Sequence, residues 1–340
     1  MKHGMGFLRT LGAFMALLVA LAALPTHAAE PQTDAANRAL AWLVGQQGDD
    51  GSIGGDAGAT ADAVTAMVAM GVDPDGVLKN GNSPVSYLGA QAATYAAKSV
   101  GGAGKLTLAV IAAGKDPSNF GGVNLINMLQ KSYNSATGQY GPTTTDHVFA
   151  LLALASAGQT VPPAAVAALE KLQLADGGWS YDGTVATGSD TNTTALAVQA
   201  LKATSGGSAA LPKAQAYLLS QQNADGGFPY SKTSPFGSDS DANSTAYVIQ
   251  ALVALGVDPA TLKQGANTPL TALLALQNTS GAFRYQTAIP DDNIFATEQA
   301  IPALLLKSFP LKTAVSVRLW LPLLSDMRAI SGALKPIIVP

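Results

Sequence analysis

The chain has 340 residues, of which 48% are apolar and only 12% charged, with a formal net charge of −3 and no cysteine. High apolar content with little charge excludes an intrinsically disordered chain. Scattered basic residues argue against a nucleic-acid partner, because phosphate contacts need clustered Lys and Arg. The absence of cysteine excludes disulfides, thiolate metal sites, cysteine nucleophiles and thioester chemistry.

The first 28 residues have the three parts of a secretory signal peptide. Lys2 and Arg9 precede an apolar core at Leu11–Leu24, which ends at Pro25 before the small-residue sequence Thr-His-Ala. The alternative, an uncleaved membrane anchor, needs about 20 apolar residues, and this core is shorter. We therefore expect cleavage near Ala28 and an exported protein with no transmembrane segment after cleavage. It would be extracellular, periplasmic or at the cell surface.

A repeat organises the rest of the chain. Its clearest mark is the turn sequence Gly-x-aromatic-x-Tyr, which occurs within residues 175–181, 224–230 and 279–285. Each turn follows an apolar segment that often ends in Gln, and precedes a Ser/Thr/Asp/Asn cluster and a second apolar segment. Glycines end five of these second segments, at intervals of 43, 44, 48 and 50 residues: Gly71, Gly114, Gly158, Gly206 and Gly256. The period is thus real but elastic, as in other repeat architectures.

Each repeat predicts a pair of helices. Ala-rich apolar segments favour helix, polar residues before them act as N-caps, and Gly followed by Pro ends them. We expect the first helices of the pairs near Ala36–Gln47, Ser83–Lys98, Val123–Ser132, Pro163–Leu174, Pro212–Gln222 and Thr268–Gln277. We expect the second helices near Thr60–Met70, Lys105–Ala113, Thr145–Ala157, Thr193–Thr204, Thr245–Leu255 and Ile294–Leu306.

The Gln…Asp-Gly-Gly-Trp/Phe sequence resembles the repeat of the squalene-cyclase and protein-prenyltransferase superfamily. Its strongest copies run from Gln173 to Trp179 and from Gln222 to Phe228. The resemblance implies an all-α fold, an α6/α6 toroid of six helical hairpins, over residues 29–309. In that superfamily the turn ties the outer helices together and the following helices line a central cavity. Residues 310–340 would then form a short, irregular or strand-like C-terminal extension.

The second helices carry candidate site residues. Aligned by their N-terminal clusters, they place six side chains at equivalent positions: Asp62, Lys105, His147, Leu196, Tyr247 and Thr297. If these helices form the inner ring, such side chains would face one cavity near one mouth. Our ligand-binding candidates are Asp62, Lys105, His147, Tyr247, Asn192, Asn243, Trp179 and Phe228. The alternative is that these residues serve packing, and that the amides, with Asn293 aligned to them, serve as N-caps.

Known toroid chemistries fit the chain incompletely. Triterpene cyclases that this repeat resembles use an Asp-x-Asp-Asp acid, whereas the segment from Asp239 to Asp241 lacks the last Asp and the Asp291-Asp292 pair lacks the first. Zinc prenyltransferases use Asp, Cys and His, but this chain has no Cys and would keep only His147 after signal cleavage. We therefore expect no metal ion and no bound cofactor.

Two functions remain open from the sequence. The first is a non-catalytic binding module for an apolar, isoprenoid-like or cofactor-like small molecule, or for a surface protein, as in exported vitamin-carrier toroids of the transcobalamin type. The second is an enzyme of the terpenoid cyclase or polysaccharide lyase type. Its catalytic candidates are Asp239, Asp241, Asp291 and Asp292. Acids that converge in a pocket with shifted titration would favour the enzyme.

Overall fold

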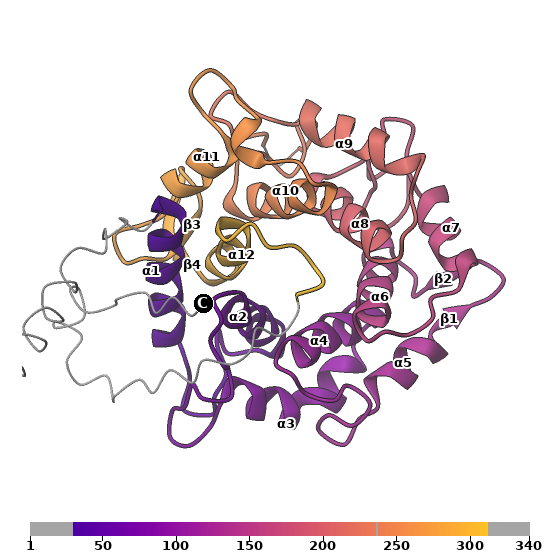
Figure 1. The fold of residues 1–340 in the computed structure, drawn as a ribbon, viewed down its shortest axis with the longest axis vertical. Coiled ribbons are helices and arrows are strands. Elements are labelled where there is room, and N and C mark those ends of the chain that lie inside the picture. Colours follow the sequence, from indigo (N-terminus) through magenta and orange to yellow (C-terminus); the bar gives the residue numbers. More distant parts are fainter. Residues whose placement is uncertain (1–29, 236, 312–340) are drawn as a thin grey trace, which may run out of the picture.

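The computed structural model describes residues 30–235 and 237–311, and twelve α-helices in this part form two concentric layers (Figure 1). The expected signal peptide and nearly all of the expected C-terminal extension lie outside the described residues. None of the described helices is long and apolar enough to cross a membrane. Inner and outer helices alternate along the chain, as six hairpins require.

The inner layer consists of every second helix. Its members are α2 (Ala57–Ala69), α4 (Val100–Ala112), α6 (Thr144–Ser156), α8 (Thr191–Ala203), α10 (Ala242–Leu255) and α12 (Ile294–Leu304). The outer layer consists of α1 (Pro31–Gly45), α3 (Pro84–Ala96), α5 (Leu125–Lys131), α7 (Pro163–Lys171), α9 (Ala210–Ser220) and α11 (Pro269–Ala275). The expected α/α toroid is confirmed.

The remaining regular structure lies in the connections. Antiparallel strands β1 (Tyr133–Asn134) and β2 (Gln139–Tyr140) form the turn after α5, and β3 (Phe283–Gln286) and β4 (Ile289–Asn293) form the turn after α11. A 3₁₀ turn, η1 (Pro259–Thr261), follows α10. These short hairpins lead the chain into α6 and α12.

Every inner helix begins at a polar side chain that caps it. The six N-caps are Asp56, Ser99, Thr143, Asp190, Asp241 and Asn293. Each accepts a backbone N–H of the first turn, which satisfies donors that have no partner within the helix. Helix α4 starts five residues before its expected beginning at Lys105, because Ser99 caps a glycine-rich first turn. Gly104 has no room for a side chain there, since a Cβ would lie 2.7 Å from the backbone of Phe149.

In four of the six hairpins, a glutamine after the outer helix bonds to the neighbouring hairpin. Gln173 donates from Nε2 to the carbonyl of Gly177 in its own turn at 2.8 Å and to that of Ala210 at 2.9 Å. Gly177 has a φ of 92°, and a Cβ there would lie 2.5 Å from the Lys213 carbonyl oxygen. Only glycine allows this approach, so the turn packs directly on the next outer helix.

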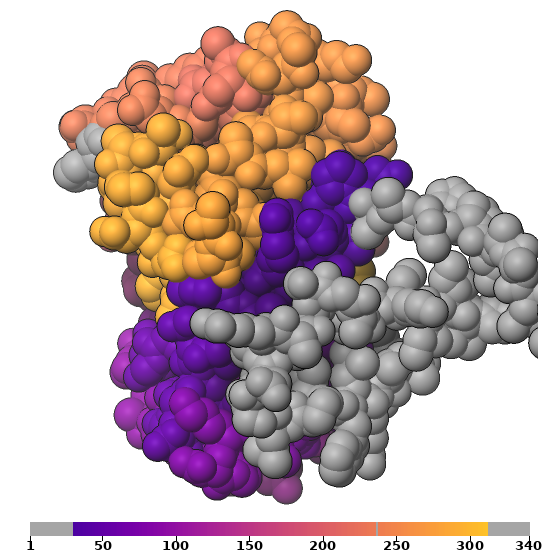
Figure 2. Space-filling model, turned by 90° about the vertical axis from the view of Figure 1, so that its left-hand side faces the viewer, coloured from indigo at the N-terminus to yellow at the C-terminus, as the bar shows by residue number. Residues whose placement is uncertain are grey.

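The same bond closes the ring. Gln277, after α11, donates to Gly281 in its own turn and to the carbonyl of Ala35 in α1, both at 2.8 Å. Helix α1 packs on α11 and α12, and α12 packs on α2. Figure 2 shows the indigo N-terminal part against the orange and yellow C-terminal part. The six hairpins therefore form a closed ring and not an open solenoid.

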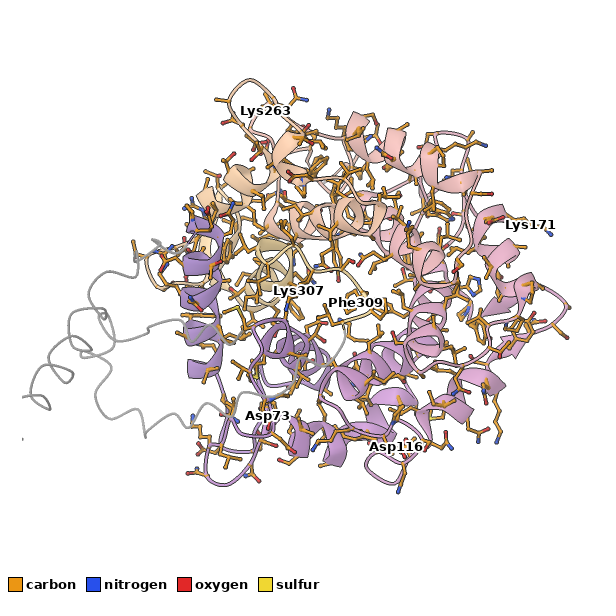
Figure 3. All side chains as sticks on the ribbon, in the orientation of Figure 1. Asp73, Asp116, Lys171, Lys263, Lys307 and Phe309 are labelled. Carbon is orange, nitrogen blue, oxygen red and sulfur yellow. The ribbon has the colours of Figure 1, made fainter. Side chains whose placement is uncertain are left out.

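The segment after α12 crosses the inner ring on the side where the inner helices end. Lys307 donates from Nζ to the carbonyl of Ala69 at the end of α2, at 2.6 Å. The backbone N–H of Phe309 donates to Oε1 of Gln199 on α8, at 2.8 Å. Figure 3 places Lys307 and Phe309 in the middle of the ring. Residues 305–311 thus span the ring from α12 and α2 to α8.

Candidate functional site

A set of equivalent side chains lies six residues after the N-cap of each inner helix. They are Asp62, Lys105, Phe149, Leu196, Tyr247 and Gln299, which we call the mouth cluster. Equal spacing from the helix start places them on the same face of each helix. They lie in the N-terminal half of their helices, on the side opposite the segment that crosses the ring.

Lys105 shows that this face points into the ring. Its Nζ donates to Oδ2 of Asp62 on the neighbouring α2 at 2.8 Å, and lies 6.0 Å from the ring centroid of Phe149 on α6. Its charge also acts on Tyr247, which comes from α10 on the other side of the ring. Side chains from opposite helices therefore influence each other electrostatically across the ring's interior.

The charged members of the cluster are enclosed but still reached by solvent. The side chains of Lys105 and Asp62 are 23% and 14% exposed. Burial alone would lower the pKa of Lys105, but the facing Asp62 carboxylate, together with Tyr247 and Tyr95, outweighs burial, so the pKa lies above its usual value. Burial raises the pKa of Tyr247 to about 12. At neutral pH Lys105 therefore keeps its ammonium form and Tyr247 keeps its phenol.

The two sides of the mouth differ in polarity. Phe149 and Leu196, from the adjacent helices α6 and α8, form an apolar wall. On the other side Gln299 accepts a hydrogen bond at 2.7 Å from Nδ2 of Asn243, which lies one helical turn before Tyr247. Asn192 takes the same position before Leu196 on α8. The mouth cluster therefore has one apolar side and one polar side.

His147 and Thr297 are not part of this face. They lie four residues after their caps. At this position the side chain accepts a hydrogen bond from the backbone N–H of a buried residue in the turn before the helix. The acceptors at this position are Thr60, His147, Thr194, Thr245 and Thr297, and their donors are Ile53, Tyr140, Trp179, Phe228 and Phe283. The expected alignment thus combined two positions that differ by two residues.

Both ring nitrogens of His147 bind backbone groups. Nδ1 accepts from the Tyr140 N–H at 3.0 Å, and Nε2 lies 2.9 Å from the Ala165 carbonyl oxygen, so the neutral Nε2–H tautomer fits. Burial lowers the pKa of His147 to about 4. The imidazole holds α6, its turn and α7 together and has no side free for the mouth.

Trp179 and Phe228 also lie away from the mouth. Both are completely buried, and Trp179 donates from Nε1 to the Leu169 carbonyl at 2.8 Å. Their side chains fill the space between the layers beneath their turns. In this structure they contact protein on all sides, so they support the fold and do not line the candidate site.

The expected catalytic acids do not converge. Asp241 is completely buried and caps α10, where its two oxygens accept from the N–H and the hydroxyl of Ser244, each at 2.7 Å. Burial raises the pKa of Asp241 to about 6, and has the same effect on the α8 cap, Asp190. Asn192 and Asn243 are helix residues, so of the three aligned amides only Asn293 is a cap.

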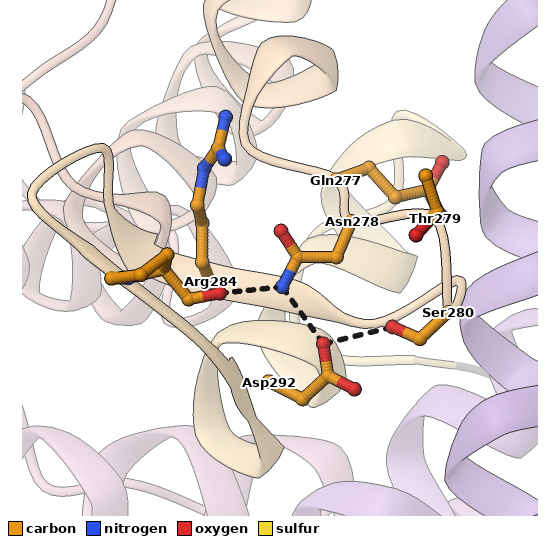
Figure 4. Close-up of a pocket in the computed structure, with 7 residues that line it drawn as sticks. Gln277, Asn278, Thr279, Ser280, Arg284 and Asp292 are labelled. Atoms are coloured by element: carbon orange, nitrogen blue, oxygen red, sulfur yellow. Dashed lines mark hydrogen bonds between the residues drawn. The ribbon is translucent and has the colours of Figure 1, made fainter.

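The other three acids are exposed. Asp239 lies in the loop before α10, and Asp291 and Asp292 lie on β4. Asp292 accepts from Asn278 at 2.7 Å and from Ser280 at 2.8 Å in a polar surface hollow at the α11–β4 turn (Figure 4). Within residues 30–235 and 237–311 no three His, Asp or Glu side chains gather in a way that would hold a metal ion.

Sequence reasoning missed three residues of the site. Phe149 and Gln299 complete the mouth cluster, and Glu298 lies beside it with a raised pKa and only 1% exposure. Counting six residues from each capping side chain would have found Phe149 and Gln299. No comparable signal distinguishes Glu298, because its importance depends on burial.

Comparison with known proteins identifies the fold. No family model matches the chain, and no curated protein matches its sequence. Among solved structures, a variant of the type II terpene cyclase MstE from Scytonema, in complex with geranylgeranyl dihydroxybenzoate, superposes with a TM-score of 0.58 at 14% identity, over 81% of this chain and 97% of that one. The chain is an α/α toroid.

Two further structures share the toroid. The unsaturated glucuronyl hydrolase from Bacillus sp. GL1 matches with a TM-score of 0.58 at 16% identity, over 81% of this chain and 95% of the hydrolase. A protein from Actinoplanes matches with a TM-score of 0.54 at 16% identity, over 81% and 98% of the two chains. At such identities the likeness concerns the fold alone. One fold can carry many different functions.

Proposed function

We propose that this toroid is an exported binding protein that holds a small amphipathic molecule in the mouth of its inner ring. The observation that carries the proposal is the mouth cluster. Its apolar wall, Phe149 and Leu196, would contact the ligand's body, while Lys105, Asp62 and Tyr247 would contact its polar end. Ligand sites in proteins combine such apolar linings with a few polar groups.

Residues 305–311 cross the ring at the end opposite the mouth cluster, which supports a site that opens on one side. They are attached to α2 and α8 by the Lys307 and Phe309 hydrogen bonds on the other side of the ring. A ligand would therefore enter between the N-terminal ends of the inner helices. Those ends carry partial positive charge, which suits an oxygen-bearing group.

Native mass spectrometry of the protein purified from its own host tests the proposal. We expect a small molecule to co-purify, and expect Leu196→Trp, which would fill the apolar side of the mouth, to lose it. Leu219→Trp on the exposed face of outer helix α9 is the matched control and should retain the ligand. Retention of the same molecule by the Leu196 variant would refute the proposed site. The intact mass should also begin after Ala28 if the chain is exported as proposed.

An enzyme is the second candidate, favoured by two of the fold relatives. A terpene cyclase and a glucuronyl hydrolase carry out chemistry on this fold. The acids that we would assign to such chemistry are Asp239, Asp241, Asp291 and Asp292, of which only Asp241 is buried. Turnover of an isoprenoid or an acidic glycan by the wild-type protein, lost in Asp241→Asn, would replace the binding proposal with this one.

A further inference from the structure

Glu298 is a buried carboxyl group for which the fold gives no structural reason. It is 1% exposed, and neither side-chain oxygen has a hydrogen-bond partner among the described residues. It lies five residues after its cap, Asn293. The other inner helices have small or apolar residues at that position: Ala61, Gly104, Val148, Ala195 and Ala246. Burying a carboxyl group without a hydrogen-bond partner is unfavourable, so packing alone does not explain its presence.

Glu298 belongs electrostatically to the mouth. Helix α12 lies between α10 and α2 in the ring. The groups that act on the Glu298 carboxyl are Asp62 and Asp56 of α2 and Lys105 of α4, and Glu298 in turn acts on Tyr247 of α10. Burial and the nearby Asp62 carboxylate raise the pKa of Glu298 well above its usual range, and Lys105 opposes this only in part. Both effects favour the neutral, proton-donating form of this carboxyl group.

The two charged side chains of the mouth cluster already balance each other without a ligand. Lys105 and Asp62 neutralise each other at 2.8 Å. A protonated Glu298 and the Tyr247 phenol add two uncharged O–H donors beside this pair. A ligand carboxylate would face Asp62, and a ligand ammonium would face Lys105, so either would bring an unbalanced charge into an enclosed site. An uncharged oxygen would instead accept a hydrogen bond at no such cost.

We propose that Glu298 donates a hydrogen bond to an uncharged oxygen of the bound molecule, so that the site selects neutral alcohols and carbonyl compounds over acids and amines with the same apolar body. This inference rests on the proposed binding function. To that function it adds the chemical class of the ligand's polar head group and the residue that recognises this group.

Titration calorimetry with 1-decanol, decanoate, decylammonium and decane tests the inference on the purified protein at pH 6. We expect 1-decanol to bind about tenfold more tightly than decane, as one added hydrogen bond allows, and more tightly than either ion. Tighter binding of decanoate or decylammonium than of 1-decanol would overturn the inference and leave the binding proposal standing. No binding by any of the four would overturn both.

Three variants assign the effect to Glu298. Glu298→Leu should bring the 1-decanol affinity down about tenfold, to that of decane. Glu298→Gln keeps an N–H donor that does not titrate, so its affinity should stay within about threefold of wild type at pH 6 and not fall at higher pH. Wild-type affinity should fall as pH rises and Glu298 ionises. Glu170→Gln, on the outer helix α7, is the matched control. Equal 1-decanol affinity of wild type and Glu298→Leu would refute the role of Glu298.

Discussion

The Nζ of Lys105 lies 2.8 Å from Oδ2 of Asp62, and this ion pair joins the neighbouring inner helices α2 and α4 at equivalent positions of the repeat. Helices α6 and α8 have Phe149 and Leu196 at those positions. The mouth is therefore charged on the side of α2 and α4 and apolar on the side of α6 and α8.

Loss of the Asp62 carboxylate should destabilise the protein because it leaves Lys105 enclosed without a counter-ion. We expect Asp62→Asn to lower the free energy of unfolding by about 1–2 kcal/mol, between the values for exposed and buried pairs. Asp34→Asn is the control, because the Asp34–Arg38 pair is mostly exposed, and should cost less than about 0.5 kcal/mol. Urea denaturation measures both, and equal costs would contradict our account of the pair.

Ring closure should depend on Gln277. Gln277→Ala removes the donor that two backbone carbonyls share, Ala35 and Gly281. We expect a loss of about 1–3 kcal/mol, the usual cost of leaving buried polar groups without partners. Gln46→Ala is the matched control, because its exposed amide donates to the carbonyl of Trp42, one turn earlier in α1. Thermal unfolding compares the two; a Gln277 variant as stable as the control would argue against this closure.

His147 should make the protein less stable in acid. Its pKa is lowered from 6.5 to about 4, mainly by burial, so the unfolded chain takes up a proton before the folded protein does. The stability that neutral His147 contributes is complete above pH 6.5 and is lost as pH falls toward 4. Between pH 7 and 4.5, the His147→Gln variant should therefore lose about 1–3 kcal/mol less of its free energy of unfolding than wild type does. An NMR titration of the imidazole with a midpoint near 6.5 would disprove the assignment.

Asp241 should act in the opposite direction. Burial raises its pKa from 3.8 to about 6, so the folded protein holds the proton longer than the unfolded chain does. Its contribution is present below pH 3.8 and is lost as pH rises through 6. Asp241→Asn keeps a capping oxygen, so its stability relative to wild type should increase by about 1–3 kcal/mol from pH 4.5 to 7. Chemical denaturation at both pH values measures this, and an unchanged difference would refute it.

The sequence predicted the helix pairs because each of their marks has a local physical cause, whereas the closed toroid was implied by the resemblance to the squalene-cyclase and protein-prenyltransferase repeat. Caps such as Asp56 and Asp190 and the Gly-aromatic turns fix where helices begin and how neighbouring hairpins join, and these features repeat. The glycine-rich start of α4 was missed because glycine disfavours helix, whereas here it allows α4 to approach Phe149 closely.

The site was harder to predict because it depends on helix phase. An alignment by polar clusters placed His147 and Thr297 with Lys105, although they lie two residues nearer to their caps and serve the turns. A shift of two residues turns a side chain by more than half of a helical turn. Glu298 carries no local mark at all, since only the packed ring makes its carboxyl group unusual.

Methyl NMR of the protein titrated with 1-decanol tests the central claim, that the ring's mouth is a ligand site, most directly. We predict that the methyl signals of Leu196, in the mouth cluster, shift and show intermolecular contacts with the decanol chain, while those of the exposed Leu219 on α9 stay unchanged. Decanol contacts at Leu219 with none at Leu196 would place binding outside the ring and contradict the account.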